Sequence, residues 1–299
     1  MPSFLSDHDQ IELIAPARSV SKKDIDSAIK IIESNSFSVT YSKNLFDYKD
    51  IFSGTKNQRI HAFQKALDNP KTKAIFFVRG GYGAIQIIDD IDFSNFSKNP
   101  KWLVGFSDIT TILMHVYSQY RINSIHGPMP FNFQKTESLS VNNIFNLLRG
   151  NLKKMEFPAH KLNKAGIASG ILIGGNLSVL CSLIGSPSFM RTNHDTILFI
   201  EDVDEYIYHI ERMMYMLSRS GFLKRIQGLI VGKMTNIMDN KIAFGQTVHQ
   251  AINNIVKQYT YPVCFNAPIG HHKNNNPIII GSKITLDVNS ESSKIYNIK

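Results

Sequence analysis

Hydrophobic residues in the first half of the chain follow two spacings in turn, one typical of strands and one typical of helices. Short apolar runs predict buried strands at 11–17, 37–42, 73–81, 101–106 and 122–129. Apolar residues three or four positions apart predict helices between them, at 22–34, 57–69, 83–91 and 108–120. Repeated strand–helix units of this length are typical of a parallel sheet that helices cover on both faces.

A polar, lysine-rich stretch at 150–167 interrupts this alternation. We place a domain boundary there and expect an α/β domain at 1–150, a linker at 151–167 and a second domain at 168–299. Within the second domain, the same patterns predict strands at 195–202, 226–234 and 261–272 and helices at 208–222 and 247–259. The last segment, 277–299, predicts two or three more strands.

Composition and hydropathy are those of a globular protein without a membrane anchor. Hydrophobic residues make up 43% of the chain and charged residues 19%, which is enough to bury a core. The longest apolar runs, such as AIFFV and TILFI, are far shorter than the roughly 18 residues that a membrane span needs. The N-terminal sequence lacks the pattern of a signal peptide. Cys181 and Cys264 lie inside apolar runs, which favours buried free thiols over a disulfide. We therefore expect a cytoplasmic protein.

The chain is basic, with 33 lysine and arginine residues against 24 acidic residues and a formal charge of +9. A charge of this sign makes nucleic acid the first partner to consider. The basic residues are scattered, however, and no run of them alternates with aromatic residues. This distribution favours a solvated lysine-rich surface over a nucleic-acid site, although the charge can still attract an anionic substrate.

Two glycine-rich segments resemble nucleotide-binding loops but do not match them. In RGGYGAIQ, Gln86 stands where the dinucleotide fingerprint has its third glycine. In GLIVGKM, three residues instead of four separate the glycines, and no serine or threonine follows the lysine. The sequence contains no HExxH and no CxxC pair, and its histidines are spread out apart from His271 and His272. We therefore expect neither a metal nor a cofactor.

Ser107 stands between the predicted strand at 101–106 and the predicted helix at 108–120. A serine at this place commonly caps the helix, because its hydroxyl accepts a hydrogen bond from an unpaired backbone N–H. The same order of strand, turn, serine and helix also exposes the hydroxyl of a nucleophile elbow at the carboxyl edge of a parallel sheet. In that case the helix N-terminus, with the N–H of Asp108, stabilises a developing oxyanion. The local sequence GFSD departs from the GxSxG of α/β-hydrolases.

A serine nucleophile needs a histidine as its base and a carboxylate that orients the histidine. Glu201 ends the apolar segment DTILFIED, and His271 follows CFNAPIG at the end of another strand. Each residue has a plainer interpretation, Glu201 as a solvated carboxylate at a strand end and His271 as a histidine on a surface loop. All three candidates nevertheless lie where strands end, which is where the active sites of α/β proteins form.

Segments that cover almost the whole chain resemble, in the same order, the LD-carboxypeptidases of bacterial murein recycling. They are IELIAPARSVSK, GTKNQRIHAFQKALDNPKTKAIFFVRGGYGAIQIID, LVGFSDITTIL, HGPM, GGNLSVLCSLIGSP, LFIEDVDEYIYHIERMMYML and APIGHHKNNNPIIIG. Members of this family are serine peptidases with a Ser–Glu–His triad. The resemblance implies that Ser107 is the nucleophile, Glu201 the orienting carboxylate and His271 the base.

The resemblance also implies roles for residues around the triad. RGGYG becomes the loop that faces the nucleophile, with Gly81 as the second oxyanion donor opposite Asp108. Arg79 in this loop is expected to bind the substrate. So is Asn176 in GGNLS, because it follows two glycines between a predicted strand and a predicted helix. Asn176 has a second interpretation, as a turn residue that bonds its own backbone.

The last motif departs from the family's pattern. GHHKNNNPIIIG has Ile279 where the family usually has a proline, and His272 lies next to His271. The neighbouring histidine leaves the identity of the base open between the two.

The implied fold has a Rossmann-like parallel-sheet domain that carries Ser107 and a mixed, β-rich α/β domain that carries Glu201 and His271. The implied protein is a homodimer that releases terminal D-Ala from murein tetrapeptides, so its expected partner is a muropeptide, with no nucleic acid and no membrane. An alternative within the family is a microcin-immunity amidase that cleaves peptide–nucleotide conjugates. Such enzymes stack a nucleobase on an aromatic residue of the second domain, whereas the single tryptophan here, Trp102, precedes Ser107 in a core strand. The alternative outside the family is a non-catalytic protein that binds a small ligand.

Overall fold

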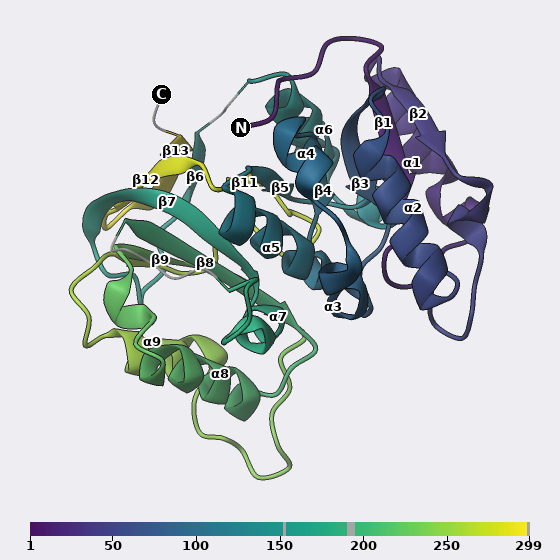
Figure 1. Cartoon of the computed structure of the whole chain (residues 1–299). Coiled ribbons are helices and arrows are strands. Elements are labelled where there is room, and N and C mark those ends of the chain that lie inside the picture. Colours follow the sequence, from purple (N-terminus) through teal and green to yellow (C-terminus); the bar gives the residue numbers. More distant parts are fainter. Residues whose placement is uncertain (152–153, 190–194, 298–299) are drawn as a thin grey trace. The chain divides into compact units, whose positions relative to one another are not determined.

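The computed structural model describes residues 1–151, 154–189 and 195–297, and the chain divides into two compact units (Figure 1). The first unit contains Met1–Asn151 and Lys273–Ile279, and the second contains Leu152–His272 and Ile280–Lys299. We expected an unbroken second domain at 168–299, whereas Lys273–Ile279 belongs to the first unit. Parts of the predicted linker and second domain lie outside the described residues, namely 152–153, 190–194 and 298–299.

The first unit is built on a sheet with the strand order β11-β5-β4-β3-β1-β2. Its strands are β1 (Gln10–Ile14), β2 (Ser38–Tyr41), β3 (Thr72–Phe77), β4 (Trp102–Gly105), β5 (Ser124–His126) and β11 (Ile278–Ile280). The pairs β1–β2, β1–β3, β3–β4 and β4–β5 are parallel, as the alternation of strand and helix patterns predicted. The late segment that contains β11 joins this sheet beside β5.

Helices cover both faces of this sheet (Figure 1). They are α1 (Lys22–Ser34), α2 (Lys56–Asp68), α3 (Ala84–Ile87), α4 (Ser94–Lys98), α5 (Thr110–Tyr120) and α6 (Ser138–Leu148). Phe76 and Phe77, consecutive residues of β3, contact helices on opposite faces of the sheet. Phe76 stacks on Phe145 of α6, with ring centroids 6.4 Å apart, and Phe77 meets Phe63 of α2 at 5.4 Å. Because side chains alternate along a strand, both faces are buried, which explains the continuous apolar runs in the sequence.

Helix α2 has defined contacts at both ends. At its start, the Thr55 hydroxyl accepts a hydrogen bond from the Gln58 N–H at 3.3 Å, and the Gln58 side chain accepts one from the Thr55 N–H at 2.7 Å, which is a capping box. Near its end, Nζ of Lys101 donates to the carbonyl oxygens of Ala66, at 3.0 Å, and Asn69. Side chains therefore bond backbone N–H and carbonyl groups that would otherwise be unpaired at the two ends of the helix.

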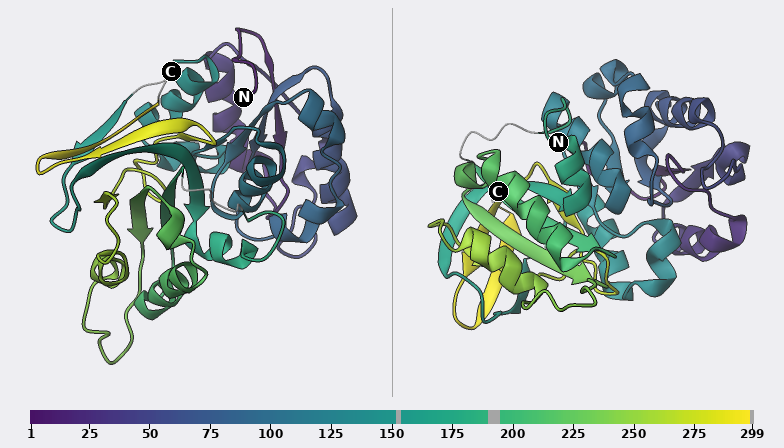
Figure 2. Two further views of the ribbon diagram at one scale, coloured as in Figure 1. Left: turned by 60° about the vertical axis from the view of Figure 1, so that its left-hand side comes forward. Right: turned by 90° about the horizontal axis from the view of Figure 1, so that it is seen from below.

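The second unit has a sheet with the strand order β10-β9-β8-β7-β12-β13-β6. Its strands are β6 (Met155–Pro158), β7 (Gly166–Asn176), β8 (Thr196–Val203), β9 (Gly228–Thr235), β10 (Val263–Cys264), β12 (Lys283–Val288) and β13 (Ser292–Asn297). Strands β7 to β10 pair in parallel, whereas β7, β12, β13 and β6 pair antiparallel. The helices are α7 (Leu177–Leu183), α8 (Ile207–Arg219) and α9 (Val248–Val256), and Figure 2 shows α8 and α9 side by side. This is the mixed α/β domain that the resemblance implied.

Several elements were not predicted from the pattern, among them β6 and α6. Strand β6 lies within the expected linker and pairs with β13 at the edge of the second sheet. Phe157 is the one buried residue of this strand, so there is little alternation of apolar and polar positions to detect. Helix α6 was also missed, although its buried Val141, Ile144 and Leu148 have helical spacing.

The two cysteines are free and buried, as expected, with Cys181 in α7 and Cys264 in β10. Burial raises the pKa of the Cys181 thiol to about 12. This thiol is therefore protonated and unreactive at neutral pH. In the part of the chain that the structure describes, no helix has both the length and the apolar character that crossing a membrane requires.

Candidate active site

Ser107 lies at a sharp turn between β4 and α5. Strand β4 ends at Gly105, a 3₁₀ turn covers Ser107–Ile109, and α5 begins at Thr110. The backbone of Ser107 is left-handed, with φ +65°, a conformation that is uncommon and costly for a residue with a Cβ. Phe106 and not Ser107 occupies the cap position of this turn, so helix capping does not explain the serine. A strained serine between a strand and a helix is the geometry of a nucleophile elbow.

Gly80 of RGGYG packs against this turn. A Cβ on Gly80 would stand 3.2 Å from the Ser107 Cβ and 3.3 Å from Cε of Met129, so a side chain there would crowd the serine. Gly81 and Gly83 have φ values of +101° and +144°, in a range that residues with a side chain rarely adopt. The loop after β3 therefore lies directly beside Ser107, and its backbone shape depends on glycine.

Asp108 connects the serine turn to the end of the glycine loop. Its buried side chain accepts a hydrogen bond at 2.9 Å from the N–H of Ala84, the first residue of α3. Burial raises the pKa of this carboxyl above its usual range, against the opposing effects of the Ala84 N–H and the nearby Arg59 guanidinium. The Asp108 side chain thus holds together the segments that follow β3 and β4.

Arg79, at the start of the loop, is half-buried and held in place. One guanidinium nitrogen donates to the Ser19 carbonyl at 2.9 Å, and the guanidinium carbon lies 4.3 Å from the centre of the Phe131 ring. The stem of Arg18 lies over the same loop, since its Cδ would be 2.5 Å from a Cβ on Gly81. Burial and the charge of Arg18 lower the pKa of Arg79, but an arginine stays charged in a protein. Two neighbouring guanidinium groups favour the binding of an anion.

In the second unit, Glu201 and His271 form a hydrogen-bonded pair. Glu201 lies in β8 with 0% of its surface exposed, and its Oε2 accepts from Nδ1 of His271 at 2.7 Å and from the His271 backbone N–H at 3.2 Å. Because a carboxylate only accepts hydrogen bonds, Nδ1 carries the proton and Nε2 is the ring's proton acceptor. A carboxylate orients a general-base histidine in this way. His272 is exposed, and the residue paired with Glu201 is His271.

Two glycines leave space for the buried Glu201 side chain. A Cβ on Gly270, whose φ is +104°, would stand 2.5 Å from Oε2 of Glu201, and a Cβ on Gly232 would stand 3.2 Å from the Glu201 Cβ. Thr235 holds the loop by donating from Oγ1 to the His271 carbonyl at 2.6 Å. Neither Gly232 nor Thr235 could be identified from the sequence, because only the pairing of β9 beside β8 brings them close to Glu201 and His271.

The surroundings of His271 raise its pKa above the usual 6.5. Burial alone would lower the pKa, because it disfavours the charged ring. The charge of Glu201 and its hydrogen bond act in the opposite direction, and Asp202 and Asp204 add smaller raising effects. The ring therefore binds a proton more readily than an isolated histidine does.

Asn176 lies opposite Glu201 in the β7–β8 register and caps α7. Its Oδ1 accepts from the Val179 N–H at 3.1 Å and from the Ser178 hydroxyl at 2.8 Å. Its Nδ2 donates to Asp202 at 2.7 Å. These local bonds favour the interpretation of Asn176 as a turn and cap residue. That it also binds the substrate stays a prediction.

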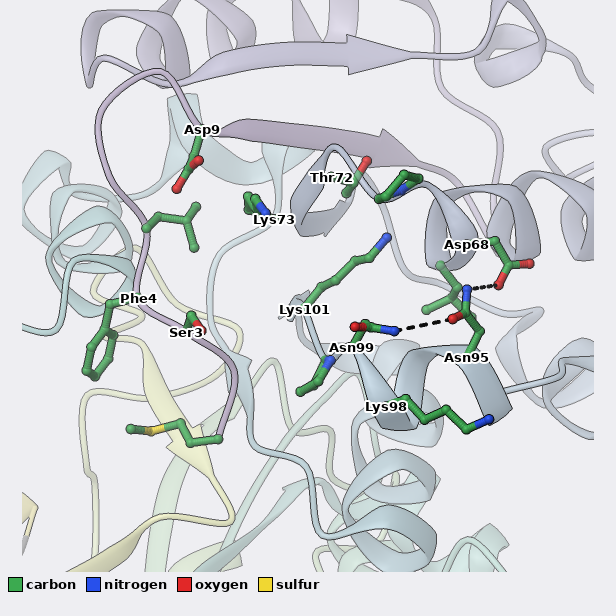
Figure 3. A pocket seen from close by; sticks show the side chains of 15 residues that line it. Ser3, Phe4, Asp9, Asp68, Thr72, Lys73, Asn95, Lys98, Asn99 and Lys101 are labelled. Atoms are coloured by element: carbon green, nitrogen blue, oxygen red, sulfur yellow. Dashed lines mark hydrogen bonds between the residues drawn. The ribbon is translucent and has the colours of Figure 1, made fainter.

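A cavity of about 640 Å³ lies at the amino ends of the first unit's strands (Figure 3). Its lining includes Asp9 before β1, Thr72 and Lys73 at the start of β3, and Lys101 before β4. The predicted site residues of the first unit follow the carboxyl ends of these strands instead. Among the described residues, no group of three or more His, Cys, Asp or Glu side chains has the arrangement of a metal site.

Two family models match the chain in succession. Residues 11–127 match the LD-carboxypeptidase N-terminal domain, and residues 169–286 match the LD-carboxypeptidase C-terminal domain. A curated relative, the probable murein peptide carboxypeptidase of Bacillus subtilis strain 168, is 28% identical, and the match covers 98% of this chain and 93% of the relative.

Solved structures have the same fold, which confirms the predicted α/β class. The muramoyltetrapeptide carboxypeptidase of Oxalobacter formigenes has a TM-score of 0.87 at 25% identity, covering 97% of this chain and 99% of its own. The microcin C7 self-immunity protein MccF has a TM-score of 0.88 at 18% identity, covering 99% and 98%, and this similarity concerns the fold alone. With both domain models matched in order, the chain belongs to the LD-carboxypeptidase family and is a hydrolase that acts as a carboxypeptidase.

Proposed function

We propose that the chain is a serine-type LD-carboxypeptidase that releases terminal D-Ala from murein tetrapeptides. Ser107 is the nucleophile, His271 the base and Glu201 the orienting carboxylate. The observation that carries the mechanism is the left-handed backbone of Ser107 at the turn after β4, since helix capping does not account for it. The substrate class rests on relatives that are named as murein and muramoyltetrapeptide carboxypeptidases.

The proposed reaction is an acyl transfer in two halves. Nε2 of His271 takes the hydroxyl proton of Ser107 as Oγ attacks the carbonyl carbon before D-Ala, and the N–H groups of Gly81 and Asp108 stabilise the oxyanion. His271 then gives the proton to the nitrogen of D-Ala, which leaves and so forms an acyl-enzyme on Ser107. A water molecule, deprotonated by His271, hydrolyses the acyl-enzyme by the same route. Glu201 stabilises the imidazolium in both halves.

A carboxypeptidase must also recognise the free carboxylate of the residue that it removes. We assign this task to Arg79, whose guanidinium is held by the Ser19 carbonyl and the Phe131 ring. Arg18 adds a second positive charge beside Gly81. As the family resemblance implies, we further propose a cytoplasmic homodimer that acts on muropeptides during peptidoglycan recycling, without a metal or a cofactor.

The test is to incubate the purified protein with murein tetrapeptide and follow D-Ala and tripeptide by mass spectrometry. The Ser107→Ala variant is the matched control, because it removes one oxygen atom and keeps every other group. Release of D-Ala by the wild type alone supports the proposal. Equal release by both proteins excludes Ser107 as the nucleophile, and release by neither excludes the tetrapeptide as the substrate.

The two alternatives predict other outcomes in the same experiment. A microcin-immunity amidase would cleave aspartyl sulfamoyl adenosine, a ligand of MccF, in preference to the tetrapeptide. Against this alternative, the chain's one tryptophan, Trp102, is fully buried in β4 and donates from Nε1 to the Ser3 carbonyl at 2.9 Å, so it is not available to stack on a nucleobase. A non-catalytic protein would bind the tetrapeptide without cleaving it.

A further inference from the structure

We propose that Arg59 is a positioning residue that holds the two backbone segments carrying the oxyanion donors, the glycine loop after β3 and the turn after β4. The inference rests on the proposed function, because that function gives Gly81 and Asp108 their task. Arg59 lies in the first turn of α2 and acts through these segments instead of through the substrate.

Arg59 is a buried cation that connects three segments of the first unit. It is 3% exposed, and its Nη1 donates to the carbonyl oxygens of Pro16 at 2.9 Å and Gly83 at 3.0 Å. Its Nη2 donates to Oε1 of Gln86 at 2.7 Å. Pro16 follows β1, Gly83 ends the glycine loop, and Gln86 lies in α3. One guanidinium therefore joins α2 to two loops at the carboxyl edge of the sheet and to the helix that follows the second loop.

The guanidinium fits closely between its neighbours. Its central carbon lies 4.7 Å from the centre of the Phe52 ring, and a Cβ on Gly83 would stand 2.7 Å from Nη1. The planar fork of arginine reaches several oxygen atoms from fixed directions, whereas the ammonium of lysine is a single point of charge on a flexible stem. Replacement by lysine thus keeps the positive charge but loses the arrangement of hydrogen bonds to Pro16, Gly83 and Gln86.

The peptide group between Gly83 and Ala84 connects Arg59 to the turn that carries Ser107. The carbonyl of the Gly83–Ala84 peptide accepts from Arg59, and the N–H of the same peptide donates to the buried Asp108 carboxylate at 2.9 Å. The charge of Arg59 also favours the ionised form of that carboxylate. A shift of this peptide therefore moves both the loop that carries Gly81 and the turn that carries Asp108.

Positions of oxyanion donors affect the rate more than they affect substrate binding. The oxyanion exists in the transition state and not in the bound substrate, so displaced donors lower kcat and leave KM nearly unchanged. A misplacement of about 1 Å can cost about a hundredfold in rate. This split between kcat and KM separates a positioning role from a purely structural one.

The experiment compares Arg59→Lys with Lys101→Met. Both substitutions remove contacts of a buried cation with backbone carbonyl groups beside α2, Arg59 near its start and Lys101 near its end. Both are expected to lower Tm. Arg59→Lys is expected to lower kcat for the tetrapeptide about tenfold to a hundredfold, with KM unchanged, and to weaken binding of a peptide boronate transition-state mimic by the same factor. Lys101→Met is expected to keep the wild-type kcat.

Chemical rescue provides a second readout. Arg59 lines a cavity of about 690 Å³, which gives guanidinium ion a path into the space that Arg59→Ala leaves. Added guanidinium is expected to restore part of the lost kcat in Arg59→Ala and to leave Lys101→Met unchanged. If Arg59→Ala does not fold, Arg59→Lys decides the question by itself.

A labelling reaction separates failure of this inference from failure of the proposed function. A fluorophosphonate that reacts with Ser107 uses the oxyanion donors but needs no murein substrate. Slower labelling of Arg59→Lys than of the wild type supports the inference even if the tetrapeptide is not cleaved. Equal labelling rates, or an unchanged kcat despite a lowered Tm, would overturn it. A wild type that neither reacts at Ser107 nor releases D-Ala would overturn the serine mechanism, and the inference with it.

Discussion

At the amino edge of the first unit's sheet, buried polar side chains bond their neighbours, whereas at its carboxyl edge, after β4, a serine with a left-handed backbone lies beside a glycine loop. At the amino edge, the Glu12 carboxylate accepts from Thr72 at 2.6 Å and from Asn69 at 3.2 Å, and Lys101 donates to carbonyl oxygens at the end of α2. At the carboxyl edge, Ser107 has φ +65°.

The difference separates residues that stabilise the fold from residues to which we assign the proposed reaction. A left-handed residue with a side chain costs about 1–2 kcal/mol, so the Ser107 conformation works against folding. Active sites of open α/β sheets form at the carboxyl ends of the strands, where strain can serve a function. The cavity at the amino edge is lined by several charged side chains (Figure 3), yet Lys101 already bonds two carbonyl groups there. A left-handed backbone alone does not mark the carboxyl edge, because His8 and Ser36, with φ +67° and +61°, precede β1 and β2 at the amino edge. Ser107 differs from them in its position between β4 and α5, beside the glycine loop.

Replacing Ser107 should have the largest effect on activity and test the strain directly. Ser107→Ala and Ser107→Gly are both expected to lower kcat by about 10⁴-fold or more. Because glycine adopts positive φ without steric cost, Ser107→Gly should be more stable than Ser107→Ala by about 1 kcal/mol. D-Ala release and denaturant unfolding provide the two measurements. Equal stability of the two variants would show that the turn is not strained, and the contrast between the amino and carboxyl edges of the sheet would no longer hold.

Gly270→Ala extends the comparison to the second unit, with a smaller expected loss of activity. The added Cβ would stand 2.5 Å from Oε2 of Glu201 at a φ of +104°, so the carboxylate must move away from His271. We expect kcat to fall by about a hundredfold and stability by about 1–3 kcal/mol. Gly245→Ala is the control, since its φ is +85° and a Cβ there meets nothing within 4 Å. Equal kcat values for the two variants would contradict the role given to Gly270.

Asp202→Asn should change the pH profile more than the maximal rate. The base must be neutral to accept a proton, so kcat/KM falls as pH drops through the raised pKa of His271. Asp202 contributes to that raised pKa, and burial together with Glu201 raises the pKa of Asp202 itself to about 7. The acid limb of the wild type therefore belongs to a coupled pair. In the variant, the acid limb of kcat/KM should show a single protonation step and lie at lower pH than in the wild type.

The protonation of His271 affects stability in the opposite direction from kcat/KM. A raised histidine pKa stabilises the fold below pH 6.5, the usual value for histidine, and this stabilisation is lost as pH rises through the pKa of the folded state.

If the acid limb of kcat/KM lies at the same pH in Asp202→Asn as in the wild type, the Asp202 charge does not act on His271.

Elements with their own local pattern could be predicted from the sequence, and so could the position of Ser107 between β4 and α5. Residues that support the site only through tertiary contacts, such as Arg59, could not. Arg59 has the sequence context of an exposed helix residue. Its partners Gly83 and Pro16 lie 24 and 43 positions away, and the folding of their loops around α2 buries it. His271 and His272 are identical in chemistry, and only the contact with Glu201 distinguishes them.

Glu12→Gln should have the smallest effect, and it tests the amino edge alone. Glutamine keeps the shape and can accept the hydrogen bonds of Thr72 and Asn69 but loses the charge, so we expect a loss of about 1 kcal/mol in stability and an unchanged kcat. Burial lowers the pKa of Lys101 to about 8, and the charge of Glu12 opposes this shift. Their attraction exists only while Lys101 is protonated, so the stability difference from the wild type should shrink as pH rises past about 8. Denaturant unfolding between pH 7 and 10, with kcat measured in parallel, would detect this. A fall in kcat would show that the amino edge also serves the reaction and would break the division between the two edges.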